Sequence, residues 1–73
     1  MAAKLIHRRV LGENIRTARK SAGFSQEKLA EKADLHPNYI GEVERAEKTI
    51  SVDALVRIAK GLKVPVVNLV RDI

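Results

Sequence analysis

The segment from Pro37 to Glu42 holds polar residues whose side chains could read the edges of DNA bases. An Asn amide can pair bidentately with adenine, and a Glu carboxylate can accept a hydrogen bond from the amine of cytosine. Asn38 and Glu42 suit these roles, and Tyr39 could touch a thymine methyl group or a phosphate. The competing interpretation is that they are ordinary exposed helix residues. The candidate base-contacting set is Pro37, Asn38, Tyr39 and Glu42.

A second group of residues could hold the phosphate backbone. Gln26 follows Ser25, a residue type that often precedes a helix, and groups at a helix N-terminus meet phosphate oxygens favourably. The alternative for Gln26 is an ordinary polar residue in a first helical turn. Such contacts position a protein on DNA and add salt dependence, but they carry no sequence information. The candidate phosphate-contacting set is Gln26, Arg45, Lys48 and Arg16.

Both groups need rigid elements to position them, and the stretch from about residue 25 to residue 45 predicts two short helices. Ser25 is a good N-cap, and Asp34 tolerates the left-handed conformation that ends a helix. His36 can cap a second helix with Pro37 in its first position, where the missing N–H has no intrahelical partner. Two short helices joined by a tight turn form a helix-turn-helix unit, which needs further helices to bury its apolar faces.

The rest of the chain predicts those further helices. From about His7 onward, apolar residues recur on one helical face, and Gly23 ends this first helix, with residues 1–6 expected to be frayed. Ser51 caps another helix, and the tail has room for a short fifth helix near Pro65. We therefore expect an all-α, compact five-helix domain over residues 1–73. The apolar face of the first helix is Leu11, Ile15, Ala18 and Ala22.

The chain resembles the Cro and phage-repressor helix-turn-helix domains, also called the Xre family. The matching pieces are SQxxLA from Ser25, IxxVER from Ile40 and an apolar pattern from Ser51 to Val64, and they cover about residues 10 to 70. The resemblance implies a lambda-repressor-like fold, and it is closer to small members such as restriction-modification controller proteins and phage-type repressors than to larger regulators. The departures from the family are Asp34 and Ala46, where Gly is usual and positive φ is favoured, and Ile50, where Pro is common.

The resemblance also implies roles for single residues. Arg19 and Glu44 match positions that form a semi-buried ion pair in the family, which ties the first helix to the end of the recognition helix. Loss of one partner leaves an uncompensated charge, at a cost on the order of 3 to 5 kcal/mol if the pair is buried. Gln26 matches a glutamine that contacts phosphate in the family.

Composition narrows the function classes. The 73 residues include 14 Lys and Arg against 9 Asp and Glu, and the net charge of +5 attracts polyanions or simply keeps a small domain in solution. There is no Cys, and the two His show no metal-ligand spacing, so neither a metal nor another cofactor is expected. No nucleophile stands with a base and an orienting acid, so an enzyme is not expected. No apolar run approaches the roughly 20 residues of a membrane span.

These features favour a sequence-specific transcriptional regulator that binds double-stranded DNA as a homodimer on a palindromic operator. One recognition helix reads few base pairs, so two copies about 34 Å apart are needed for useful specificity. We expect a cytoplasmic protein, prokaryotic and nucleoid-associated or phage-encoded, without a small-molecule effector. The alternative is an antitoxin-type or other protein-binding module whose apolar tail covers a partner protein. The candidate dimer surface is Val66, Val67, Val70 and Ile73.

Overall fold

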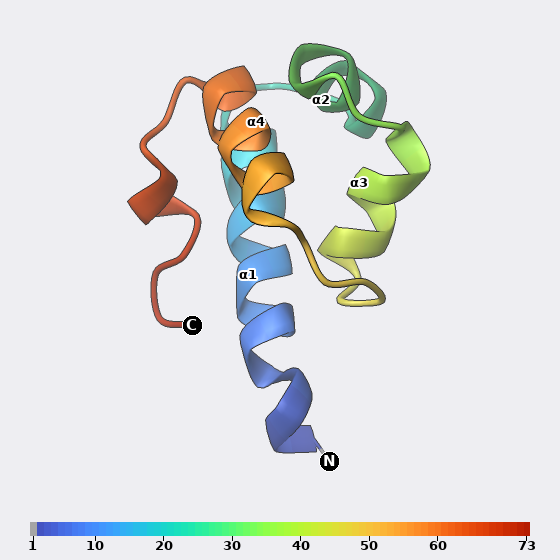
Figure 1. Cartoon of the computed structure of the whole chain (residues 1–73). Coiled ribbons are helices and arrows are strands. Elements are labelled where there is room, and N and C mark those ends of the chain that lie inside the picture. The colour runs from blue at the N-terminus through green and yellow to red at the C-terminus, as the bar shows by residue number, and fades with distance from the viewer. Residues whose placement is uncertain (1) are drawn as a thin grey trace.

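Four α-helices and one short 3-10 helix make up residues 2–73, the part of the chain that the structure describes (Figure 1). The computed structural model describes residues 2–73, with side chains from Ile6 onward, and this part of the chain contains no strand. The all-α prediction is confirmed, whereas the expected fifth α-helix is only a 3-10 turn. In chain order the elements are α1 Ala2–Ser21, α2 Gln26–Ala33, α3 Pro37–Glu44, α4 Val52–Leu62 and η1 Val66–Asn68.

Helix α1 begins at Ala2, earlier than the start near His7 that the apolar face predicted. Its N-terminal part extends beyond the other helices in Figure 1, and Ile6 there is 55% exposed. Good helix-forming residues continue a helix without a buried face, which explains the early start. At the other end, Ala22 is exposed in the turn that follows the helix, so it is not part of the buried face.

Each helical element, or the residue directly after it, contributes one large and fully buried side chain to the core. Helix α2 packs against both α3 and α4, and α1 packs against α3. At the crossing of α1 and α3, a Cβ on Gly12 would lie only 2.5 Å from the Val43 carbonyl oxygen, so only glycine fits. Helix α3 is therefore held in place from two sides. The five side chains are Ile15, Leu29, Ile40, Ile58 and Leu69.

All four α-helices end at a residue in the left-handed conformation. In each case the residue after it donates its backbone N–H to the carbonyl oxygen of the residue five positions earlier, as Leu35 does to Ala30 at 2.9 Å. Asp34 and Ala46 adopt φ of 57° and 63°, so the two departures from family glycines keep the expected turn conformation. The four residues are Gly23, Asp34, Ala46 and Lys63.

The C-terminal segment lies on the side of α1 and α4 that is away from α3 (Figure 1). Asn14 of α1 anchors this segment, because its Nδ2 donates to the Leu69 carbonyl at 3.0 Å and to the Arg71 carbonyl at 2.9 Å. Leu69 itself is fully buried. The candidate dimer surface is thus separated from α3 by α1 and α4.

Candidate nucleic-acid interface

Side-chain caps fix where α2 and α3 begin. Ser25 Oγ accepts a hydrogen bond from the Lys28 N–H at 2.9 Å, and His36 Nδ1 accepts one from the Asn38 N–H at 3.1 Å. Pro37 occupies the first turn of α3, as predicted. Since both helices are only eight residues long, these caps and the left-handed Asp34 between them set the angle at which α3 leaves the core.

Three of the four base-contacting candidates line one hollow of about 290 Å³ between the start of α2 and the outer face of α3. Asn38 is exposed, while Pro37 and Glu42 are half-buried. Tyr39 is not part of this hollow, because its ring packs against the core and its hydroxyl donates to the Thr49 carbonyl at 3.4 Å. The lining residues are Gln26, Glu27, Pro37, Asn38, Gly41, Glu42 and Arg45.

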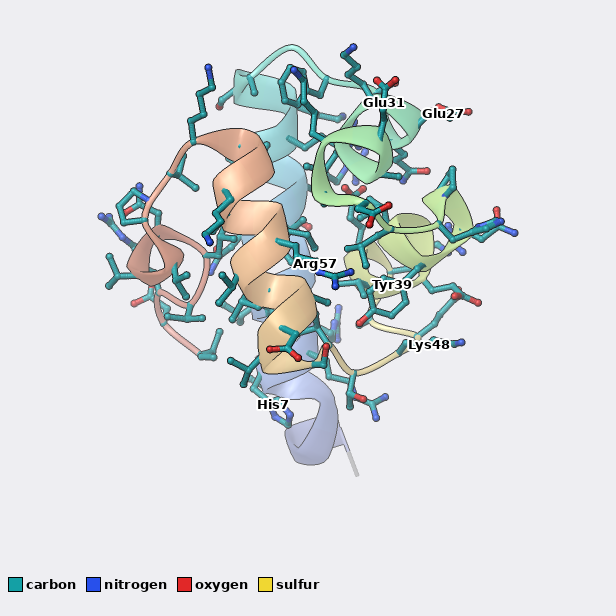
Figure 2. All side chains as sticks on the ribbon, turned by 45° about the horizontal axis from the view of Figure 1, so that its top comes forward. His7, Glu27, Glu31, Tyr39, Lys48 and Arg57 are labelled. Atoms are coloured by element: carbon teal, nitrogen blue, oxygen red, sulfur yellow. The ribbon has the colours of Figure 1, made fainter. Side chains whose placement is uncertain are left out.

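The phosphate-contacting candidates are largely gathered at a second, adjoining hollow of about 270 Å³. Arg16 from α1, Gln26 from α2 and Arg45 at the end of α3 all line it. Lys48 is not among its lining residues and lies in the following loop, where Figure 2 shows it on the outer side of the molecule. Three elements therefore contribute polar or cationic groups next to the exposed face of α3.

Arg19 and Glu44 also line this second hollow, where they form a largely buried ion pair. Arg19 Nε lies 2.6 Å from Glu44 Oε2, its Nη2 lies 3.1 Å from Oε1, and the two side chains are only 10% and 3% exposed. Gln26 Nε2 also donates to Glu44 Oε1, at 3.0 Å. The Gln26 amide is thus tied to the ion pair, and one of its two N–H groups is left to face a ligand.

Two carboxylates accompany the cations at the end of α3. Arg45 Nε lies 2.9 Å from Glu47 Oε2, and Lys48 Nζ lies 3.7 Å from Glu42 Oε1. The hydrogen bond from Arg45 lowers the pKa of the Glu47 carboxyl and raises the pKa of the guanidinium. Both groups therefore stay ionised at neutral pH. The pairing of Arg45 with Glu47 could not be predicted from the sequence, because residues two apart do not normally face each other on a helix.

This arrangement of two capped helices carrying an exposed polar face agrees with a known family. The sequence profile of the helix-turn-helix family HTH_3 matches residues 15–69, which include α2, α3, α4 and the end of α1. The chain belongs to this helix-turn-helix family. Helix α3 is the second helix of its unit. As a member of the family, the chain is a DNA-binding transcriptional regulator and not an enzyme.

Several relatives are controller proteins. Over 60 residues the chain is 43% identical to control protein C.SmaI of Serratia marcescens, and the match covers 82% of this chain and 71% of that protein. It is 41% identical over 58 residues to control protein C.BamHI of Bacillus amyloliquefaciens, covering 78% and 72%. Among solved structures, the restriction-modification controller protein C.AhdI of Aeromonas hydrophila has a TM-score of 0.84 and 31% identity, with 85% of this chain and 94% of that chain covered.

Other kinds of site find little support in the helix-turn-helix domain. Within residues 2–73 no helix is long and apolar enough to cross a membrane. The same described residues hold no cluster of three His, Asp or Glu side chains that could bind a metal ion. In this part of the chain, the polar side chains gathered at the two hollows beside α3 are therefore the candidate site.

Several contacts near the unit were not predicted from the sequence, and three of them hold the ends of α2 and α3. These three are the Gln26 bond to Glu44, the Arg45 pair with Glu47, and a long contact from Arg57 of α4, whose Nη1 lies 3.4 Å from the Asp34 carbonyl oxygen. Figure 2 shows Arg57 extending from α4 toward the side of the molecule that carries Tyr39. Each contact joins residues from different elements or across a turn, so periodicity within one helix could not have revealed it.

Proposed function

We propose that this regulator binds a palindromic operator as a homodimer, with α3 of each copy in the major groove. The observation that carries the proposal is the placing of Asn38, exposed at the start of α3, beside the hollow that Pro37 and Glu42 also line. In helix-turn-helix proteins the N-terminal residues of the second helix contact base edges, while the first helix crosses the backbone.

Asn38 and Glu42 divide the base reading between them. The Asn38 amide pairs with an adenine edge, and the Glu42 carboxylate, one turn further on, accepts from a cytosine amine. Tyr39 is turned toward the loop by its bond to Thr49, which favours contact with a phosphate or a thymine methyl group at the border of the site. Pro37 contributes an apolar contact.

The phosphate backbone is held on either side of these residues. Arg16, Gln26 and Arg45 line the adjoining hollow, and Lys48 follows in the loop, so phosphates on both edges of the groove meet donors. These groups add salt-dependent affinity and fix the register of α3. The net charge of +5 supports the same role over a longer range.

Dimerisation uses the apolar surface of the C-terminal segment. Val67 and Ile73 are 61% and 53% exposed, and Val66 and Val70 are half-buried beside them. Because this surface is separate from α3, joining two copies there leaves both α3 helices free to meet DNA. Two half-sites one helical turn apart then supply the specificity that a single short helix lacks.

The controller relatives suggest the biological setting. C.SmaI and C.BamHI are named control proteins, and C.AhdI is a restriction-modification controller protein of nearly the same length as the matched region. We infer that this chain regulates transcription in the same class of system. It would then work in the cytoplasm of a prokaryotic cell, where the DNA is.

Selection from a random pool of duplex DNA tests the proposal. The purified protein is incubated with the pool at several salt concentrations, and the bound fraction is sequenced. Enrichment of a two-fold symmetric motif is the expected result, because each copy reads one half-site. Recovery of unselected sequences that no longer bind at physiological salt would contradict the proposal. The net charge would then account only for non-specific attraction to DNA.

A further inference from the structure

Both cations at the end of α3 are held by carboxylates of the same chain. Arg45 makes a bidentate contact with Glu47, with Nε to Oε2 at 2.9 Å and Nη2 to Oε1 at 3.2 Å. The two side chains are 58% and 54% exposed. Lys48 has a looser contact of 3.7 Å with Glu42. The Arg45–Glu47 pair is therefore the tighter of the two, and it stands in open solvent where DNA would arrive.

The backbone turn at Ala46 builds this pair. Residues two apart on a regular helix point in different directions. Here Ala46 has φ of 63°, and the Glu47 N–H donates to the Glu42 carbonyl at 2.8 Å, which folds Glu47 back beside Arg45. The pair is thus a product of the helix end rather than a chance meeting of two long side chains.

The guanidinium of Arg45 is at the same time part of the wall of the DNA-facing hollows. It lies over Gly41, where a Cβ would be 3.0 Å from Nη1, and it lines both hollows together with Gln26. A guanidinium binds a carboxylate and a phosphate through the same pair of parallel N–H groups. Glu47 therefore occupies the Nε–Nη2 edge of the guanidinium, and a phosphate competes with it for this edge while the Nη1 side faces Gly41.

We infer that Glu47 is an internal competitor of the DNA backbone for Arg45, and that it lowers affinity for every duplex without taking part in base reading. This inference rests on the proposed function. A phosphate that takes the Nε–Nη2 edge of Arg45 must displace the Glu47 carboxylate, and a phosphate that binds the other N–H groups is repelled by the carboxylate beside them. The hydrogen bond from Arg45 lowers the pKa of the Glu47 carboxyl, as expected for a carboxylate paired with a guanidinium.

The test is the Glu47→Gln variant of the full chain, titrated into a fluorescently labelled duplex of random sequence and into a duplex carrying the selected operator. Gln keeps the size of the side chain and removes its charge. We expect affinity for both duplexes to rise by about three- to tenfold, because one repulsive charge beside several phosphates is removed. The ratio of the two affinities should change by less than about twofold, since Glu47 touches no base.

Glu31→Gln is the matched control. It makes the same change in net charge and breaks a similar exposed ion pair, that of Glu31 with Lys28 at 3.0 Å. Figure 2 shows Glu31 on the outer side of α2, well apart from Lys48, and it lines neither hollow. We expect its affinity for either duplex to stay within about twofold of wild type because screening weakens distant charges.

A second background separates competition for Arg45 from simple charge removal. In an Arg45→Gln chain, Glu47→Gln should raise affinity less than it does in the wild-type chain, because the contested donor is absent and only the repulsion between Glu47 and the phosphates remains. The inference is overturned if Glu47→Gln raises DNA affinity equally with and without Arg45, or if its affinity is no higher than that of the Glu31→Gln control. In either case, sequence-specific binding by the wild-type chain leaves the proposed function intact. Failure of every variant and of wild type to bind duplex DNA overturns both.

Discussion

Glu44 is the acceptor on which three hydrogen bonds converge, where the ends of α1, α2 and α3 meet. Arg19 donates twice, at 2.6 and 3.1 Å, and Gln26 donates once, at 3.0 Å, to a carboxylate whose side chain is 3% exposed. Glu44→Gln keeps the shape but leaves the Arg19 charge uncompensated. We predict that the free energy of unfolding, measured by urea denaturation, falls by about 3 kcal/mol.

Glu31→Gln gives the comparison for an exposed pair. The Lys28 and Glu31 side chains are 51% and 71% exposed, so the free energy of unfolding of the Glu31→Gln variant should stay within about 0.5 kcal/mol of wild type. If Glu44→Gln were as stable as this control, the ion pair would have no structural role.

Single-residue roles were predictable only in part. The position of the Arg19–Glu44 pair followed from resemblance to a family, and the caps at Ser25 and His36 followed from short-range chemistry. The Gln26 bond to Glu44 could not be foreseen, since no periodicity relates positions on two different helices. Nor could Glu47 be recognised as a partner of Arg45, because their pairing depends on the φ angle of the residue between them.

At the scale of elements, three of the four α-helices end at a non-glycine residue in the left-handed conformation. This conformation costs L-residues roughly 1 to 2 kcal/mol, whereas glycine adopts it freely. We predict that Ala46→Gly raises the free energy of unfolding by about 0.5 to 1 kcal/mol after the greater entropy of glycine in the unfolded chain is counted. Thermal or urea denaturation measures the change.

Ala22→Gly is the control for this change. Ala22 is exposed near the end of α1 and is not among the residues with positive φ, so glycine there brings only the entropy cost. A loss of up to about 1 kcal/mol is expected. Equal destabilisation by both substitutions would show that the left-handed turn at Ala46 carries no strain.

The elements themselves were largely predictable, and their exact type was less so. Capping residues and helical periodicity placed α2, α3 and α4, because these signals are local. The last element was expected as a helix near Pro65 but is a 3-10 turn, Val66–Asn68. Burial of Leu69 and the Asn14 contacts decide its conformation, and neither acts through neighbouring residues in the sequence.

For the molecule as a whole, the proposed binding to a palindromic operator requires a dimer, which we expect to be joined through Val66, Val67, Val70 and Ile73. Val67 is 61% exposed in the single chain, so Val67→Glu should leave its fold intact. A buried, unpaired carboxylate at the interface should raise the dimer dissociation constant by about tenfold or more. Sedimentation equilibrium over a range of protein concentrations measures this constant.

Val52→Glu is a matched control, because Val52 is 74% exposed at the start of α4 and lies outside the candidate dimer surface. It adds the same charge at another apolar surface position and should dimerise like wild type. Unchanged dimerisation of Val67→Glu, or a wild-type chain that stays monomeric at all concentrations, would place the interface elsewhere or remove it.

Helix α3 is proposed to read the bases, and the Asn38→Ala variant tests this role. The affinities of wild type and variant are measured for the selected operator, for operators changed at one symmetric base pair at a time, and for a scrambled duplex. We predict that Asn38→Ala costs about 1 to 3 kcal/mol on the operator and removes the preference at one base pair per half-site, with affinity for the scrambled duplex unchanged. A variant that keeps the full wild-type preference at every position would contradict the account, because the exposed start of α3 would then not contact the bases.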